Sequence, residues 1–187
     1  MRIVAITGST GTGKTALLNL LEAKGYATIN SDSVVREILK GSDIEGIRRR
    51  FFTDPKFRAA HERRVRPRIY IEIAKKIAYL LLMGHPVIFI EIPLLFELNL
   101  HHYFYTIVVT CDERLQIKRG GKIDYLEQRL ALQLPIAKKI ELAQKVIYNN
   151  GSINDLMDEV DRIDICGSNI YYCLLIMSII VLLITCE

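Results

Sequence analysis

The sequence predicts an α/β fold with a mostly parallel sheet, and three observations carry that prediction. Short apolar runs alternate along the chain with segments of helical periodicity, as expected of a sheet covered by helices. Residues 87–92 are apolar except for Glu91 and do not alternate, which suits a strand buried on both faces of a parallel sheet. A glycine-rich turn at residues 8–13 joins the first apolar run to the first helical segment. Ligands of such folds bind at the carboxyl ends of the strands, so functional residues are expected at that edge.

The first forty residues predict alternating strands and helices. Strand, loop, helix and strand are expected at residues 2–7, 8–13, 14–24 and 26–30. Asp32 or Ser33 is expected to cap a helix that runs toward Lys40.

The second half of the chain continues the alternation. Residues 87–92, 105–111 and 146–148 read as further strands. Residues 152–155 have the sequence Ser-Ile-Asn-Asp, which resembles the capped start of a last helix.

Length and composition limit the classes of protein. The chain has 187 residues, half of them hydrophobic, which predicts one globular domain and excludes a disordered chain. Its four cysteines lack the spacing of a zinc site or disulfide scaffold, and no signal peptide opens the chain. A cytoplasmic, reducing location is therefore expected.

Residues 8–15, with the sequence GSTGTGKT, match the phosphate-binding loop G-x-x-x-x-G-K-[ST]. The loop follows a predicted strand and opens a predicted helix, which is the context that this motif requires. Glycines let backbone N–H groups approach phosphate oxygens, Lys14 can reach the β- and γ-phosphates, and Thr15 can ligate Mg²⁺. The segment predicts binding of a nucleoside triphosphate, with ATP as the expected donor.

Two carboxylates follow predicted strands. Asp32 lies just past the second strand, where it could accept the proton of an attacking hydroxyl or could cap the next helix. Glu91 sits near the end of an apolar strand, where it could face the metal or pair with an arginine.

Basic residues cluster in two regions. Residues 48–68 hold nine basic against two acidic side chains, without the aromatic pattern of nucleic-acid readers. Nucleic acid is therefore disfavoured, and a small phosphorylated substrate and an ordinary solvated face stay open. Arg119, Lys122 and Arg129 follow the third long strand, where they could cover ATP or form a solvated helix face.

Several of these segments occur in the same order in one family, and the chain resembles dephospho-coenzyme A (dephospho-CoA) kinase from Ile3 to about Val160. The resemblance is carried by the phosphate loop, residues 29–35, 90–97 and 146–149, and by Gln116, Arg119, Arg129, Gln133 and Lys138. The phosphate loop is shared by many kinases, whereas its combination with residues 93–97 and with the Arg129–Gln133 spacing is more specific. Two positions depart from the family pattern: Arg66 replaces a histidine before proline, and Glu91 replaces an aspartate.

The resemblance implies transfer of the ATP γ-phosphate to the ribose 3′-hydroxyl of dephospho-CoA, with Mg²⁺, giving CoA and ADP. It also implies a P-loop NTPase-type three-layer fold with a five-stranded mostly parallel sheet. A helical substrate region is expected at about residues 40–84 and a short lid at about 117–129, within a kinase domain spanning residues 1–167.

The same resemblance, together with the loop motif, assigns expected roles to single residues. The expected catalytic residues are Asp32, as the base, and Lys14. ATP is expected to contact Gly8, Gly11, Thr12, Gly13, Lys14, Thr15, Ala16, Arg119 and Arg129. The second substrate is expected to contact Arg64, Arg66 and Glu97, and the metal Thr15 and Glu91.

Residues 168–187 form a hydrophobic tail that this family does not normally carry. Residues 170–186 hold no charged side chain and as a helix would span roughly 26 Å, near the short limit for a bilayer. A membrane anchor is expected, with a buried or partner-binding helix and an unproductive extension as alternatives.

Two other functions stay open from the sequence. One is a P-loop kinase of another small molecule, such as a nucleoside or nucleotide. The other is a catalytically degenerate ATP-binding protein held at a membrane.

Overall fold

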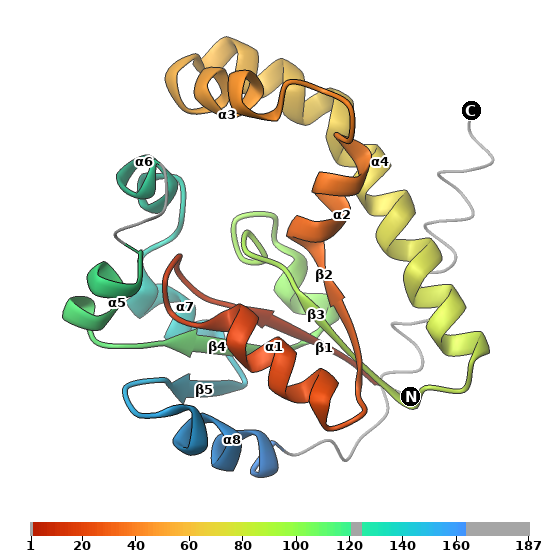
Figure 1. The fold of residues 1–187 in the computed structure, drawn as a ribbon, viewed down its shortest axis with the longest axis vertical. Helices are drawn as coiled ribbons and strands as arrows, with labels where there is room; N and C mark the ends of the chain where they lie inside the picture. The colour runs from red at the N-terminus through yellow and green to blue at the C-terminus, as the bar shows by residue number, and fades with distance from the viewer. Residues whose placement is uncertain (1, 121–124, 164–187) are drawn as a thin grey trace.

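The computed structural model describes residues 2–120 and 125–163, which form an α/β fold around a five-stranded sheet (Figure 1). The strand order is β2-β3-β1-β4-β5, and every pair of neighbouring strands is parallel. The predicted α/β class and the five-stranded parallel sheet are therefore confirmed. The strands are β1 (Arg2–Thr7), β2 (Ala27–Asn30), β3 (Val87–Glu91), β4 (Tyr105–Thr110) and β5 (Lys145–Tyr148).

The predicted strands agree with the observed ones to within one residue at each end. β1 is buried along its whole length, because β3 and β4 flank it and helices cover both of its faces. The register places Asn30 of β2 beside Glu91 of β3, and Glu91 beside Ile6 of β1. Three strands thus end together at one edge of the sheet.

The helices complete two further layers. They are α1 (Lys14–Ala23), α2 (Ser31–Ile38), α3 (Ile44–Thr53), α4 (Pro55–Leu82), α5 (Glu113–Gly120), α6 (Leu126–Ala131), α7 (Ile136–Leu142) and α8 (Ile153–Asp161). A short 3₁₀ helix, η1 (Leu100–Tyr103), precedes β4.

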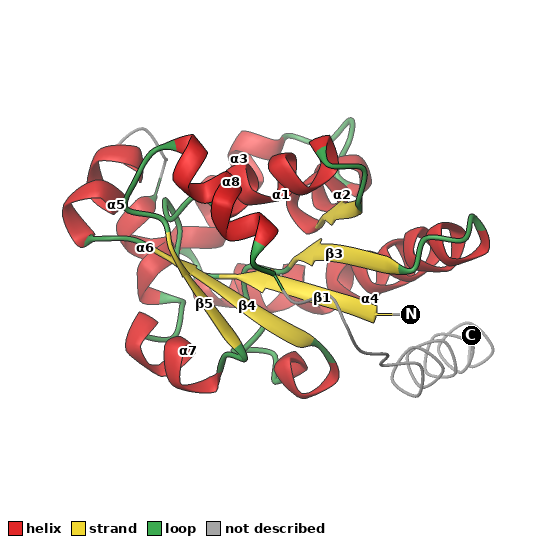
Figure 2. Cartoon of the chain, turned by 90° about the horizontal axis from the view of Figure 1, so that it is seen from below, coloured by secondary structure: helices red, strands yellow, loops and turns green. Residues whose placement is uncertain are grey.

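Alternation of the strand residues builds a separate core on each face of the sheet. On one face Ile6 and Phe89 pack with Leu17 of α1 and Leu156 of α8. On the other, Ala5 and Ile90 pack in a core that includes Val34 of α2 and Ile77 of α4. Figure 2 shows α1 and α8 on one side of the strands and α7 on the other.

One helix start differs from the prediction. Asn30, not Asp32 or Ser33, caps α2, because β2 passes into the helix without an intervening loop and Asn30 Oδ1 accepts from Ser33 N at 3.0 Å. Asp32 instead occupies the first turn of α2, where a negative charge favours the helix dipole. The predicted cap at Ser152 is confirmed, since Ser152 and Asp155 form a reciprocal capping box.

No helix within residues 2–120 and 125–163 has the length and apolar character needed to cross a bilayer. The hydrophobic C-terminal helix and membrane anchor predicted at residues 168–187 lie outside the described residues, as does Lys122.

Candidate active site

The carboxyl ends of the strands bring the chemically active segments together. The phosphate loop follows β1, Asn30 ends β2, Glu91 ends β3, and Asn149 follows β5. The phosphate loop and Glu91 were expected at this edge, because ligands of parallel sheets bind at the carboxyl ends of the strands. The sheet topology therefore positions the site as much as the loop motif does.

Close packing fixes the phosphate loop and explains two of its glycines. Gly8 and Gly13 have φ values of 144° and 98°, in the region that favours glycine. A Cβ on Gly8 would lie 2.1 Å from the carbonyl oxygen of Val109, and one on Gly13 would lie 2.2 Å from Asn149 Nδ2. Asn149 Nδ2 in turn donates to the carbonyl of Thr12 at 2.9 Å. Asn149 thus anchors the loop, a role that the sequence did not reveal.

Lys14 begins α1, and its ammonium lies inside the site. The residue is 8% exposed, and its Nζ donates to the carbonyl of Ser9 at 2.9 Å. Burial lowers the pKa of Lys14, whereas the charges of Glu91 and Asp32 raise it. Both carboxylates are therefore near enough to act on Lys14.

Two further cations act on the same ammonium. The positive charges of Lys139 and Arg129 lower the pKa of Lys14 further. Both cations are therefore in electrostatic range of Lys14 near the phosphate loop, where positive charge favours binding of a triphosphate.

Glu91 is a buried carboxylate at the end of β3. Its Oε2 accepts from Asn30 Nδ2 at 2.9 Å and from Thr15 Oγ1 at 3.4 Å. Burial raises the pKa of Glu91, Lys14 lowers it, and Asp32 raises it. Among the described residues Glu91 has no arginine partner, so its environment matches the expectation of a metal-facing carboxylate better than that of an ion pair.

These oxygens suit a divalent metal that arrives with the nucleotide. No group of three or more His, Cys, Asp or Glu side chains that could hold a metal ion occurs in the part of the chain that the structure describes. Mg²⁺ typically takes one or two protein oxygens and completes its shell with phosphate oxygens and water. The hydroxyl of Thr15 and the carboxylate of Glu91 fit that pattern.

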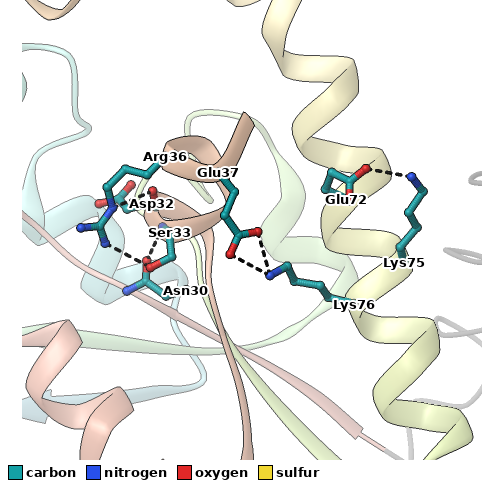
Figure 3. A network of polar contacts seen from close by, with 8 residues as sticks. All are labelled: Asn30, Asp32, Ser33, Arg36, Glu37, Glu72, Lys75 and Lys76. Atoms are coloured by element: carbon teal, nitrogen blue, oxygen red, sulfur yellow. Dashed lines mark hydrogen bonds and ion pairs between the residues drawn. The ribbon is translucent and has the colours of Figure 1, made fainter. Parts of the chain in front are cut away.

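Asp32 lies on the exposed side of the same site, in the first turn of α2. Figure 3 shows Asp32 beside Asn30, Ser33 and Arg36. Arg36 binds the backbone oxygen of Asp32 at 3.4 Å and the hydroxyl of Ser33 at 3.1 Å. The carboxylate of Asp32 is therefore available to solvent and to a second substrate while remaining in electrostatic range of Lys14.

Two of the residues that carried the family resemblance connect helix α5 to the site, one to the phosphate loop and one to Asn149. Gln116 Nε2 donates to the carbonyl of Thr10 at 2.8 Å, and Arg119 Nη1 donates to the carbonyl of Asn149 at 2.8 Å. Arg119 is thus held against the residue that anchors the loop.

The predicted substrate residues lie in different surroundings. Arg64 is exposed on α4, and Arg66 pairs with Glu62 one turn away at 2.9 Å. Glu97 is the more enclosed of the three, because its Oε1 accepts from Leu134 N at 2.7 Å and pairs with Lys139 Nζ at 2.9 Å.

Lys139 is a site residue that sequence analysis missed. It is 0% exposed and its ion pair with Glu97 lacks hydrogen-bond geometry, so the ammonium Nζ has no hydrogen-bond partner within residues 2–120 and 125–163. In the sequence Lys139 looks like its exposed neighbour Lys138, and only the packing of α7 against β4 separates the two.

Replacement of Lys139 with methionine is expected to lower the free energy of unfolding by about 3–5 kcal/mol, because it leaves Glu97 without its countercharge. Urea unfolding of the purified variant measures this loss. Lys138→Met is the matched control: Lys138 pairs with Glu141 on the surface, so a change within about 0.5 kcal/mol is expected. Equal stability of the two variants would show that the buried pair contributes nothing.

A parallel sheet of this order, a glycine-rich loop before α1 and a buried lysine whose ammonium lies within that loop define a P-loop phosphotransferase. Comparisons with known proteins make the class more specific. A family model described as dephospho-CoA kinase matches residues 43–155. Because the matched range excludes the phosphate loop, the family match is independent of a motif that many kinases share.

Individual relatives agree with the family model. The chain is 32% identical to dephospho-CoA kinase of Wolinella succinogenes, over 86% of this chain and 92% of that protein. It is 31% identical to dephospho-CoA kinase of Helicobacter pylori, over 85% of this chain and 94% of that protein. The crystal structure of TT1252 from Thermus thermophilus superposes with a TM-score of 0.74 at 25% identity, covering 89% of this chain and 98% of that one. The chain belongs to the dephospho-CoA kinase family and is an ATP-dependent kinase, as the resemblance predicted.

Proposed function

We propose that this chain transfers the γ-phosphate of ATP to the ribose 3′-hydroxyl of dephospho-CoA, giving CoA and ADP. The observation that carries the proposal is the placement of one exposed carboxylate, Asp32, within electrostatic range of the buried Lys14 at the phosphate loop. Family membership favours dephospho-CoA over the nucleoside and nucleotide acceptors that the sequence left open.

Each part of the site has a distinct task in this reaction. The backbone of residues 8–15 binds the phosphates, and Lys14 neutralises charge on the β- and γ-oxygens. Asp32 accepts the proton of the ribose 3′-hydroxyl while the hydroxyl oxygen forms a bond to the γ-phosphorus. The bond between the γ-phosphorus and the ADP oxygen breaks, and ADP leaves. Arg119 and Arg129 neutralise charge on the group in transfer.

Thr15 and Glu91 are the residues that would hold Mg²⁺. When bound, this ion neutralises negative charge on the β- and γ-phosphate oxygens. Two observations support this assignment: Thr15 Oγ1 and Glu91 Oε2 lie 3.4 Å apart, and Mg²⁺ typically takes only one or two protein ligands.

The second substrate would bind along the basic part of α3 and α4, within the proposed substrate region at residues 40–84. Arg64 is exposed and Arg66 half-buried, so burial shuts neither guanidinium off from a phosphate-bearing substrate. The carboxylate oxygen Oε2 of Glu97 is buried and has no hydrogen-bond partner in the part of the chain that the structure describes, so it is the oxygen that would accept from a substrate hydroxyl or amine.

A side-by-side acceptor assay tests the proposal. With ATP and Mg²⁺, dephospho-CoA is expected to give a kcat/KM at least about a hundredfold above adenosine or AMP, because a site built to bind a substrate group rejects analogues that lack it. Comparable values for all acceptors would contradict the assignment, and tight ATP binding without any phosphorylated product would favour the degenerate binding protein.

We also propose a cytoplasmic kinase domain, residues 1–167, attached to a membrane by residues 168–187. The support is the uncharged segment 170–186 in the sequence. Fractionation of the full chain and of a chain ending before Ser168 separates the outcomes. The anchor requires that only the full chain sediment with membranes, and recovery of both in the supernatant would oppose it.

A further inference from the structure

Phe52 and Arg129 connect two parts of the molecule that serve different substrates. Phe52 lies near the end of α3, in the proposed substrate region, whereas Arg129 lies on α6, beside the nucleotide site. The guanidinium carbon of Arg129 is 5.4 Å from the centroid of the Phe52 ring. This is a cation–π distance, in which the negative face of the ring attracts the cation.

A second aromatic ring supports the first. Tyr125 stacks on Phe52 with centroids 5.2 Å apart and an interplanar angle of 20°. Its backbone φ is 57°, a conformation that is uncommon for a bulky residue and that persists only where surrounding contacts hold it. The stack on Phe52 is such a contact, and it fixes the start of α6, the helix that carries Arg129.

Arg129 has little else to define its position. Its Nε is buried and has no hydrogen-bond partner among the described residues. Its charge nevertheless reaches Lys14, since it lowers the pKa of that ammonium. The guanidinium therefore lies against the ring of Phe52 and within electrostatic range of Lys14.

We propose that Phe52 is a positioning residue for phosphoryl transfer, which holds the guanidinium of Arg129 at the phosphate loop. The inference rests on the proposed function, in which Arg129 neutralises charge on the transferring phosphoryl group. A displaced guanidinium stabilises that charge less, because electrostatic catalysis depends on donors placed before the reaction. A residue of the substrate region, Phe52, thereby determines where the guanidinium of Arg129 lies relative to ATP.

Three single variants test the proposal. Phe52→Leu keeps an apolar side chain but removes the ring, and kcat is expected to fall about tenfold. Phe52→Tyr keeps the ring face and is expected to retain kcat within about twofold. Tyr26→Leu is the matched control, because the Tyr26 ring is also half-buried and packs on an aromatic side chain, Phe89, but it precedes β2 and lies outside the proposed substrate region. Its kcat is expected to stay that of the wild type.

A double-mutant cycle separates positioning from general packing. In an Arg129→Met background, Phe52→Leu is expected to change kcat by less than about twofold, since its partner is already gone. An equal loss of kcat in both backgrounds, or no loss in Phe52→Leu alone, would overturn the proposal.

Calorimetry with ATP keeps the inference separate from the choice of acceptor. A wild-type protein that does not phosphorylate dephospho-CoA would refute the proposed function. The Phe52 and Arg129 double-mutant cycle is then measured through the Kd for ATP instead of through kcat. Phe52→Leu is expected to weaken ATP binding about fivefold only when Arg129 is present. Unchanged Kd values across the cycle in a protein without turnover would reject the positioning role as well.

Discussion

Replacing Asp32 with asparagine is expected to lower kcat with dephospho-CoA by a factor of about 10²–10⁴ and to leave the Kd for ATP nearly unchanged. The amide has the shape of the carboxylate but cannot take the proton of the attacking hydroxyl. ATP binding is retained because the backbone of residues 8–15 and Lys14 provide the phosphate contacts in this account. Steady-state kinetics combined with calorimetry measure both quantities.

Glu37→Gln provides the control for Asp32→Asn. Glu37 is another exposed carboxylate on α2, and it pairs with Lys76 of α4 at 3.0 Å (Figure 3). Its removal takes the same charge from the same helix and is expected to leave kcat unchanged. If Asp32→Asn retains kcat within about threefold of the wild type, Asp32 is only a first-turn charge of α2, worth about 0.3–1 kcal/mol to the helix.

Replacing Lys14 with methionine is expected to reduce kcat by about 10²–10³ and to weaken ATP binding as well, because the ammonium faces phosphate charge in both the ground state and the transition state. Methionine has a similar length and removes a buried charge, so the protein is expected to fold. A thermal unfolding curve without nucleotide checks this directly.

Lys24→Met separates the local effect of Lys14 from a loss of positive charge. Lys24 lies at the other end of α1 and pairs with Asp161 of α8. Wild-type kinetics are expected for Lys24→Met. Equal activity of Lys14→Met and Lys24→Met would mean that the phosphate loop does not serve catalysis.

Local pattern was enough to predict the elements that position the site. The apolar run before Gly8 and the leucines after Lys14 predicted β1, the loop and α1, since each depends on neighbours in the sequence. Glu91 was recognised as unusual because a carboxylate in an apolar strand needs a partner, and Asn30 and Thr15 provide it.

The features that sequence analysis missed depend on contacts between distant segments. Asn149 anchors the loop from the end of β5, and Lys139 is buried through packing of α7 against the sheet. The ring of Phe52 meets Arg129 only because α3 and α6 approach each other. No periodicity in the sequence marks such contacts, since each joins segments that are far apart in the chain.

The position of the transferred phosphate on the product tests directly whether this chain phosphorylates the ribose 3′-hydroxyl of dephospho-CoA. Purified protein would be incubated with Mg²⁺, dephospho-CoA and ATP, and the product examined by phosphorus NMR. One phosphate on the ribose 3′-oxygen is expected for each ADP formed, and at least about a hundredfold slower phosphorylation with Lys14→Met. Phosphate on another hydroxyl, or release of all of it as inorganic phosphate, would contradict the proposed reaction.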